Sequence, residues 1–172
     1  RLSTRSRLPP RPEVPHEARR RPGTEAVALA AGFAEALKLT DKIKSKETLR
    51  LMKLRNMLAG KILKKISGSD INGDLDQTLP NILSVSVDGC EGEALVIYLD
   101  AAGIAVSGRS ACTSSENGPS HVILALGKAR ERVAGVIRFS LGRETKQEDI
   151  RKVLLELLRV VELLRLHTPR EK

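Results

Sequence analysis

Apolar residues recur every three or four positions over two stretches after residue 23, the spacing that places them on one face of a helix. The first stretch begins at Thr24, which we interpret as a helix N-cap. The second covers residues 41–66, and Gly68 follows it as a stop signal. The sequence therefore predicts two amphipathic helices, followed by a loop over residues 67–81. The first apolar face consists of Ala26, Val27, Leu29, Ala30, Phe33, Ala34 and Leu37, and the second of Ile43, Leu49, Leu51, Leu54, Leu58, Ile62 and Leu63.

Two later stretches alternate with the period of a strand that is buried on one face. In the first, Ser84 and Ser86 separate the apolar residues Leu83, Val85 and Val87. In the second, residues 136–141, Arg138 and Ser140 project from the face opposite the apolar one. The apolar residues of this second stretch are Ile137, Phe139 and Leu141. Arg138 is therefore free to face a ligand.

Glycine and proline mark the elements between these two strands. Residues 91–102 are predicted to be helical, and Gly103 supplies the left-handed conformation that ends a helix. Residues 104–106 are expected to form a short strand. Pro119 suits a first helical position and predicts a helix that ends near Gly127.

The last helix begins with Thr145 and Glu148 in the relation of a capping box. Its buried face is expected to contain Ile150, Val153, Leu154, Leu157, Leu158, Val161 and Leu164. Only 2% of the 172 residues are aromatic, so aliphatic side chains must fill the interior. These features predict an α/β (α+β) fold in which helices pack on a small sheet.

The charge is concentrated at the N-terminus. The net charge is +9, and residues 1–22 contribute +5 of it through seven arginines and two acidic residues. These residues also hold five of the eight prolines, so we expect a disordered or non-native tail, and the prolines exclude the amphipathic helix of a transit peptide. The remainder has neither a basic stripe nor an aromatic platform, which argues against nucleic-acid binding by the folded part.

Composition limits the environment and the chemistry of the chain. No apolar run approaches the roughly 20 residues that span a bilayer, so no membrane segment is expected. Two cysteines cannot form a disulfide framework, which favours a reducing compartment such as the cytoplasm. His16, His121 and His167 are scattered and form no zinc pattern, so we predict no metal held by this chain.

A run of small residues, 106–115, surrounds Cys112. Structural cysteines usually lie among apolar neighbours, whereas this thiol lies among hydroxyls and glycine, close to the cation of Arg109. Arg109 either lowers the thiol pKa or points into solvent. We interpret Cys112 as a reactive sulfur in a mobile loop; the alternative is an inert thiol at the surface.

Several motifs, in this order along residues 16–165, resemble the cysteine desulfurases, pyridoxal-phosphate enzymes of the class V aminotransferase group. The resemblance implies the small C-terminal domain of a fold-type I transferase together with the end of its large domain. Residues 1–22 would then be the tail, 23–40 the end of the large domain and a linking helix, and 41–172 the small domain with the cysteine loop. The motifs are His16-Glu17, Arg21-Pro22-Gly23-Thr24-Glu25, Ser110-Ala111-Cys112, Pro119-Ser120-His121 and Arg138-Phe139-Ser140-Leu141-Gly142-Arg143.

The resemblance also implies roles for three residues. Cys112 matches the nucleophile that accepts sulfur as a persulfide, and Arg138 matches the arginine that grips the substrate carboxylate. Thr24 matches a threonine that contacts the cofactor phosphate of the opposite subunit, although its residue type alone suits a cap equally well. Arg138 could instead pair with a surface acid. His121 suits a first-turn residue better than a catalyst, and Arg143 could be structural.

The sequence departs from the family pattern in three places. It has no Ser-x-His-Lys, the family context of the lysine that forms a Schiff base with pyridoxal phosphate, so the chain alone is expected to be inactive. The glycine-rich strand and turn of the family are replaced by the proline-rich tail, which suggests a fragment. Gly108 and Arg109 stand where the family has Thr-Gly.

These features predict a piece of a homodimeric cysteine desulfurase that takes sulfur from L-cysteine and supplies iron–sulfur clusters or tRNA thiolation through an acceptor or scaffold protein. One alternative is another class V aminotransferase or lyase, which would not need Cys112. A second is a persulfide carrier, which would need Cys112 but not Arg138. A third is a non-catalytic interaction module that binds an acidic partner or RNA through its basic tail.

Overall fold

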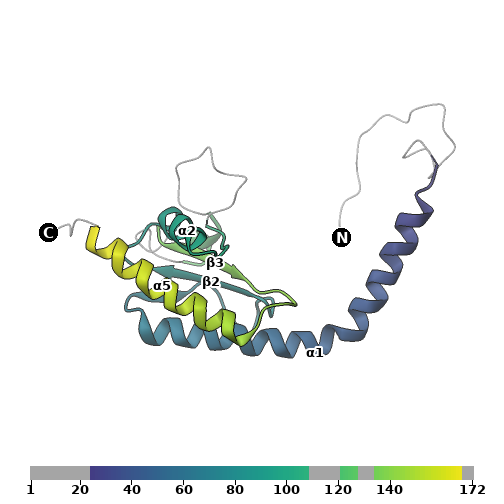
Figure 1. Cartoon of the computed structure of the whole chain (residues 1–172), viewed down its shortest axis with the longest axis horizontal. Coiled ribbons are helices and arrows are strands. Elements are labelled where there is room, and N and C mark those ends of the chain that lie inside the picture. The colour runs from purple at the N-terminus through teal and green to yellow at the C-terminus, as the bar shows by residue number, and fades with distance from the viewer. Residues whose placement is uncertain (1–23, 109–120, 128–133, 168–172) are drawn as a thin grey trace. The chain divides into compact units, whose positions relative to one another are not determined.

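The computed structural model describes residues 24–108, 121–127 and 134–167. Its elements, drawn in Figure 1, are α1 (Val27–Lys65), β1 (Ser69–Ile71), β2 (Ile82–Val87), α2 (Gly92–Ala101), α3 (His121–Ala125), β3 (Val136–Ser140) and α5 (Gln147–His167). The chain divides into two compact units, residues 1–44 and 45–172, and α1 crosses the boundary between them. The predicted tail over residues 1–22 lies outside the described residues.

Helix α1 is one continuous helix, so the prediction of two helices was wrong. Thr40 and Asp41 resembled a boundary in the sequence, but both fit inside the helix. The Thr40 hydroxyl donates to the Ala36 carbonyl at 2.8 Å, and Asp41 forms an ion pair with Lys44 at 2.6 Å. The helix begins at Val27, so Thr24 precedes it and does not occupy the N-cap.

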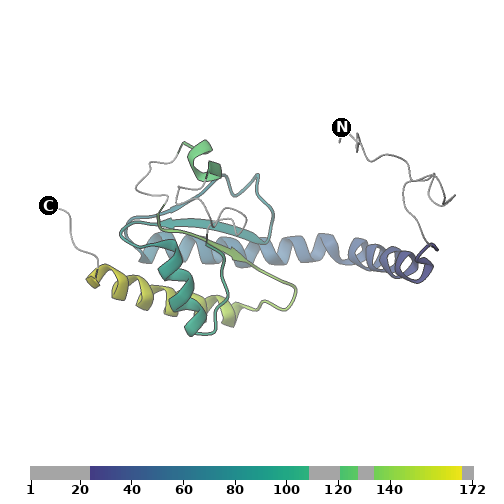
Figure 2. The same ribbon diagram turned by 90° about the horizontal axis from the view of Figure 1, so that it is seen from above.

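The three strands form an antiparallel sheet in the order β1-β2-β3. The predicted strands β2 and β3 are confirmed and lie side by side in Figure 2. Their apolar side chains are buried on one face, although Ser86 on the other face is buried as well. Strand β1 occupies part of the predicted 67–81 loop. The strand expected over 104–106 is absent, and a single bridge pairs Ser107 with Arg138 instead.

One apolar cluster joins the sheet to three helices. The second half of α1 contributes Leu58 and Ile62, and α2 and α5 contribute Leu99 and Leu157, which are all at most 1% exposed. Leu49 and Leu63 were predicted to be buried but are 62% and 49% exposed, because they lie on the other side of α1. From the inner face of the sheet the cluster includes Leu83, Val85, Val87, Ile137 and Phe139.

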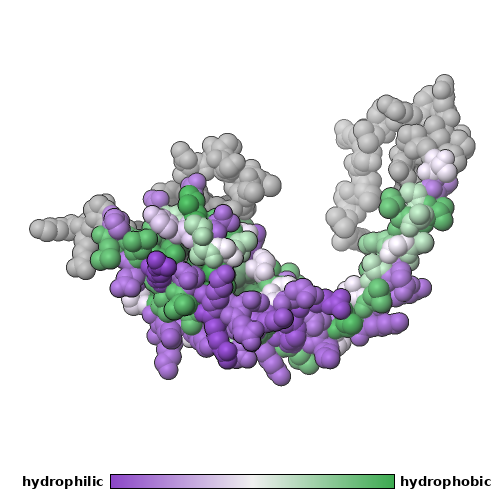
Figure 3. All heavy atoms as spheres, viewed as in Figure 1, coloured by the Kyte–Doolittle hydropathy of each residue, from purple (hydrophilic) through white to green (hydrophobic). Residues whose placement is uncertain are grey.

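The first half of α1 leaves its apolar side chains exposed, as the green surface on that segment in Figure 3 shows. Among the residues that the structure describes, none buries this face. The exposed large side chains are Val27, Leu29, Phe33, Leu37 and Leu39. Leu29, Phe33 and Leu37 are four residues apart and share one side of the helix, as is typical of a segment that packs against another part of a protein or a partner. In the described part of the chain, no helix has the length and apolar character needed to cross a membrane.

The start of α5 differs from the predicted capping box by one residue. Asp149 accepts a hydrogen bond from the Lys146 backbone N–H at 2.8 Å, so Asp149 replaces Glu148 in this role. The Thr145 hydroxyl instead accepts from the Gly142 N–H at 2.9 Å and closes the turn that precedes the helix. The carboxylates of the first turn still favour the helix N-terminus electrostatically. The other predicted stops are confirmed, since Gly68, Gly103 and Gly127 all have positive φ angles.

Arg55 is a buried charge that the sequence patterns did not reveal. Its side chain is 0% exposed, and its Nη1 donates to the Leu79 carbonyl at 3.0 Å and to the Thr78 hydroxyl at 3.3 Å. Its Nε donates to the Asn56 side chain at 3.0 Å. Nη2 has no hydrogen-bond partner among the described residues. Arg55 therefore ties α1 to the segment that leads into β2.

Replacing Arg55 by methionine is expected to lower the free energy of unfolding by about 2 kcal/mol. Methionine keeps most of the volume and suits a helix, so the loss reports the hydrogen bonds to residues 78 and 79, offset by removal of the unsatisfied Nη2. Urea denaturation measures the change. Lys53→Met, an exposed substitution on the same helix, is the control and should change stability little. Equal stability of the two variants would contradict the assigned role of Arg55.

Candidate active site

Arg138 projects from the polar face of the sheet, as its position in the sequence pattern predicted. Its residue is exposed, whereas its neighbours Ile137 and Phe139 are buried on the opposite face. The strand register places Ser84 directly across from it on β2. On the other side, the Arg138 N–H donates to the Ser107 carbonyl at 2.7 Å, and the Ser107 N–H donates to the Arg138 carbonyl at 3.1 Å. Arg138 thus lies between two serines.

A buried asparagine supports one of these serines. Asn72 is 5% exposed, and its side-chain amide donates to the Ser84 hydroxyl at 3.2 Å. Its side-chain oxygen accepts from the Ser86 hydroxyl at 2.9 Å. Its backbone N–H donates to the Ser84 carbonyl at 2.9 Å, so Asn72 continues the ladder beyond β1. These bonds fix the orientation of the Ser84 hydroxyl.

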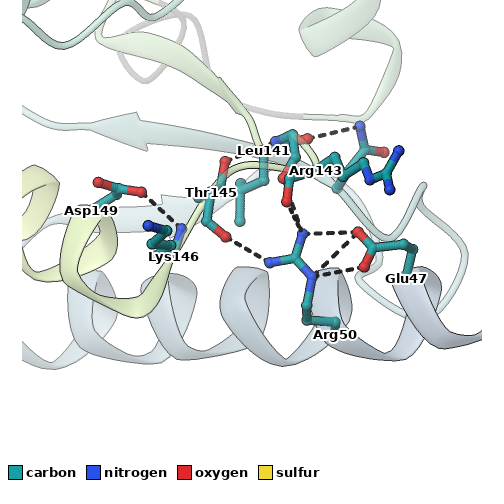
Figure 4. A network of polar contacts seen from close by, with 9 residues as sticks. Glu47, Arg50, Leu141, Arg143, Thr145, Lys146 and Asp149 are labelled. Atoms are coloured by element: carbon teal, nitrogen blue, oxygen red, sulfur yellow. Dashed lines mark hydrogen bonds and ion pairs between the residues drawn. The ribbon is translucent and has the colours of Figure 1, made fainter.

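The turn after β3 is held to α1 by Arg50 (Figure 4). The guanidinium donates from Nη1 to the Thr145 carbonyl at 2.6 Å and from Nη2 to the Arg143 carbonyl at 2.8 Å. Glu47 accepts from Nε and Nη2 of the same arginine, at 3.1 and 2.9 Å. The described contact of Arg143 is therefore made by its backbone, which fits the structural interpretation. The Arg50 clamp fixes the end of the strand that carries Arg138.

The hydrogen bonds from Arg50 lower the pKa of Glu47 below its ordinary value of 4.5, and the same pair raises the pKa of Arg50. A carboxyl group whose pKa is lower in the folded than in the unfolded protein stabilises the fold above its unfolded pKa. This contribution is lost as the pH falls through the folded value.

The wild type should therefore be more stable than Glu47→Gln at neutral pH, and the difference should shrink as the pH falls below about 4.5. Urea midpoints of both proteins between about pH 7 and pH 3 measure this convergence. Asp76→Asn, which removes an exposed carboxylate of the loop before β2, serves as a control. If the urea midpoints of wild type and Glu47→Gln differed by the same amount at every pH, this ion pair would not contribute to stability.

Cys90 is the cysteine that the structure describes, and its environment is unreactive. Its residue is 6% exposed within the apolar core. Burial raises the pKa of the Cys90 thiol, and nearby Arg165 offsets only part of this effect. Arg165 also donates from Nη2 to the Ser67 carbonyl at 2.7 Å and to the Asp88 carbonyl at 2.8 Å. Cys90 is thus a packed structural thiol next to an arginine that holds two turns together.

Cys112, Arg109 and Pro119 lie outside the described residues, so their predicted roles stay predictions. The root of the cysteine segment is nevertheless described, because Ser107 is paired with Arg138. Four residues lie between Ser107 and Cys112, and an extended chain covers at most about 18 Å over the five steps from one Cα atom to the other.

The other predicted residues occupy simpler positions. Thr24 is exposed in the segment before α1 and belongs to the first compact unit, so its predicted phosphate contact stays a prediction. His121 is the first residue of α3, as the first-turn interpretation required. Among the residues that the structure describes, no three His, Cys, Asp or Glu side chains form a metal-binding group.

Sequence reasoning missed the residues that support Arg138. Asn72 lay inside a predicted loop, and its role depends on a register with β2 that no local pattern reports. Arg50 lies among many lysines in a predicted helix, and no local pattern distinguishes it from them. The signal that could have found Asn72 is its place immediately before Gly73, whose φ of 90° makes the turn at the end of the β1 edge.

Residues 13–153 match the family model described as Aminotransferase class-V. The chain is 39% identical over 153 residues to a protein named cysteine desulfurase IscS from Dictyoglomus turgidum, covering 89% of this chain and 39% of that one. It is 45% identical over 135 residues to the cysteine desulfurase IscS of Proteus mirabilis, covering 78% and 33%. This chain thus spans well under half the length of these relatives.

Two solved structures are similar in fold. A protein described as NifS-like superimposes with a TM-score of 0.73 at 28% identity, covering 92% of this chain and 41% of that one. A NifS-like protein from Rickettsia africae gives a TM-score of 0.66 at 27% identity, covering 83% and 36%. The helices and small antiparallel sheet described above therefore recur in solved proteins.

Proposed function

Because this chain belongs to the class-V aminotransferase family, we propose that the complete protein is a cysteine desulfurase that transfers sulfur from L-cysteine to Cys112 and releases alanine. The names of the similar proteins from Dictyoglomus turgidum and Proteus mirabilis support this activity. The presence of a cysteine within residues 106–115, the small-residue segment, supports it independently.

The observation that carries the proposal is the pair of backbone hydrogen bonds between Ser107 and Arg138. Arg138 offers a guanidinium suited to the α-carboxylate of an amino acid, since two parallel N–H groups match two carboxylate oxygens. The same pairing anchors the segment that leads to Cys112. The substrate carboxylate and the segment that carries the thiol would therefore both be attached to the sheet at Arg138.

The proposed transfer balances without an outside oxidant. The Cys112 thiolate attacks the sulfur of L-cysteine, a sulfur–sulfur bond forms, and the carbon–sulfur bond of the substrate breaks. The electron pair of the broken bond stays with the carbon fragment, which takes up a proton and leaves as alanine. The enzyme keeps a persulfide on Cys112, which a second thiol or another acceptor then removes.

Pyridoxal phosphate is the cofactor that the family implies, and it would supply an electron sink for cleavage of the carbon–sulfur bond. The described residues of this chain supply no lysine suited to a Schiff base with it. Their lysines lie on α1, in α5 or immediately before α5, and none lies on the strand face that carries Arg138. We therefore expect the chain alone to be inactive. Thr24 stays our candidate for a contact with the cofactor phosphate.

We further propose that the complete protein is a cytoplasmic homodimer that delivers sulfur to an acceptor, either an iron–sulfur scaffold protein or a tRNA-thiolating enzyme. The exposed apolar side chains on the first half of α1 support a packing partner. The near balance of charge outside residues 1–22 argues against direct nucleic-acid binding.

The full-length gene product that contains these 172 residues tests the proposal. It is incubated with pyridoxal phosphate and L-cysteine, alanine is quantified, and the peptide that contains Cys112 is examined by mass spectrometry. We expect alanine to form in step with one additional sulfur atom on that peptide. Formation of a keto acid, or of alanine without sulfur on Cys112, would instead indicate another aminotransferase or lyase of the family. Sulfur uptake on Cys112 from an added persulfide donor, without any alanine from L-cysteine, would indicate a carrier.

A further inference from the structure

A row of polar residues crosses the outer face of the sheet through Arg138. The register pairs Arg138 with Ser84 of β2, and the isolated bridge pairs it with Ser107 on the other side. Directly opposite residues of antiparallel neighbours point to the same face, with Cβ atoms about 4.5 to 5.5 Å apart. Ser84, Arg138 and Ser107 therefore present their side chains side by side.

The hydrogen-bonding pattern brings Ser84 especially close to Arg138. Arg138 directs both its N–H and its carbonyl toward Ser107, so it shares no backbone bond with Ser84. A pair of this type has its Cα atoms about 4.5 Å apart, compared with about 5.5 Å for a hydrogen-bonded pair. The Ser84 hydroxyl thus lies next to the base of the Arg138 side chain.

The hydrogen bonds that lead to Ser84 run in one direction, from the Ser86 hydroxyl through Asn72 to the Ser84 oxygen. Ser86 donates its hydroxyl proton to Asn72, and Asn72 donates its amide to the Ser84 oxygen. Among the described residues, the Ser84 hydroxyl donates no hydrogen bond of its own. A hydroxyl that already accepts a hydrogen bond is a better donor, because successive hydrogen bonds polarise one another. Ser84 is thus the terminal donor of a relay that points toward the polar face.

Arg138 is the matching cation at the end of this relay. Its guanidinium is exposed, and it forms no hydrogen bond or ion pair with any side chain in the described part of the chain. A carboxylate has about four acceptor positions, of which a bidentate guanidinium occupies two. A carboxylate bound to Arg138 therefore has acceptor positions left for a neighbouring hydroxyl.

We propose that Ser84 donates its hydroxyl proton to the same carboxylate that Arg138 binds, and that Asn72 is the positioning residue that orients Ser84. The ligand class is the α-carboxylate of a small amino acid, which rests on the proposed function. Ser84 contributes to the affinity for the carboxylate and not to the cleavage of the carbon–sulfur bond. Its removal should weaken amino-acid binding and leave the rate of the bound complex unchanged.

The test measures the Kd of L-alanine by calorimetry on the full-length protein loaded with pyridoxal phosphate, with ethylamine as the ligand that lacks the carboxylate. Ser84→Ala should weaken L-alanine binding about tenfold, which corresponds to about 1.4 kcal/mol. Ser84→Thr keeps a hydroxyl and should restore binding. Ser140→Ala is the matched control, because it removes an exposed hydroxyl one position further along the same face. Ethylamine binding should be equally weak in every variant.

A double-mutant cycle tests the positioning role of Asn72. Asn72→Ala should weaken L-alanine binding in the wild type but add no further loss to Ser84→Ala, because its effect passes through Ser84. Equal additional losses in both backgrounds would reduce Asn72 to a structural residue and overturn its assignment.

The role of Ser84 and the proposed function can each fail without the other. An unchanged Kd in Ser84→Ala, an equal loss in Ser140→Ala, or no binding of L-alanine by the wild type would each overturn the assignment of Ser84. The assay of alanine formation from L-cysteine reports the proposed function independently. A protein that binds L-alanine through Ser84 but does not desulfurate cysteine keeps this inference and loses the function.

Discussion

Replacing Cys112 by serine in the full-length protein is expected to reduce alanine formation from L-cysteine by about a thousandfold or more, with binding of L-cysteine retained. Serine has nearly the same size but a hydroxyl that is not ionised at neutral pH and cannot form a persulfide. The loss should therefore appear in kcat and not in KM. Initial rates of alanine release over a range of L-cysteine concentrations measure both constants.

The chain offers its own control in Cys90, its other cysteine. Burial raises the pKa of the Cys90 thiol, and the side chain packs in the core, so it should neither accept sulfur nor react readily with alkylating reagents. Cys90→Ala should retain turnover at a stability cost of about 1 kcal/mol. Retained turnover in Cys112→Ser, or its loss in Cys90→Ala, would refute the assignment of the nucleophile.

Gly135→Ala should be the most destabilising of the substitutions considered, with an expected loss of about 4 kcal/mol. A Cβ at this position would lie 2.1 Å from the Val87 carbonyl oxygen and 2.9 Å from the Cys90 carbonyl oxygen. Both obstacles are backbone atoms, so no side-chain rotation relieves the clash. The Gly135 carbonyl also accepts from the Val87 N–H at 3.0 Å, a bond that strand separation would break. Denaturation monitored by circular dichroism measures the loss.

Gly60→Ala makes the same chemical change where space is available. Apart from the neighbouring backbone of its own helix, no atom lies within 4 Å of a Cβ at Gly60, which is exposed inside α1. Alanine should therefore stabilise the protein by about 0.5 to 1 kcal/mol through its higher helix propensity. If Gly135→Ala were as stable as wild type, the close approach of β3 to the end of β2 would be wrong.

Strands β2 and β3, and the face from which Arg138 projects, could be predicted because they depend on alternation within six residues. Strand β1 and the absence of a strand over residues 104–106 could not, because such short segments carry no alternation pattern. The same local patterns gave α2 and the buried face of α5. They failed at Thr40 and Asp41, which are polar enough to resemble a helix start. The sequence does not reveal that the Thr40 hydroxyl finds a hydrogen-bond acceptor within the helix, the Ala36 carbonyl.

The supporting residues could not be predicted because they depend on long-range pairing. Arg50 contacts carbonyls 92 to 95 residues away, and Asn72 reaches Ser84 and Ser86 only through the register of the sheet. Arg55 interrupts the apolar face of α1 with a charge, and residues 78 and 79 supply its acceptors from a segment without regular structure. Hydropathy alone would have placed an arginine in solvent at this position.

The pairing of Ser107 with Arg138 limits how far from the sheet the proposed persulfide on Cys112 can move. Because this rung fixes one end of the segment that leads to Cys112, the persulfide can travel no farther than about 18 Å of chain from the sheet edge, plus one side chain. An acceptor protein would have to dock beside that edge and bring its own thiol within this distance. Inserting glycines into the segment would increase this distance without altering the pairing of Ser107 with Arg138.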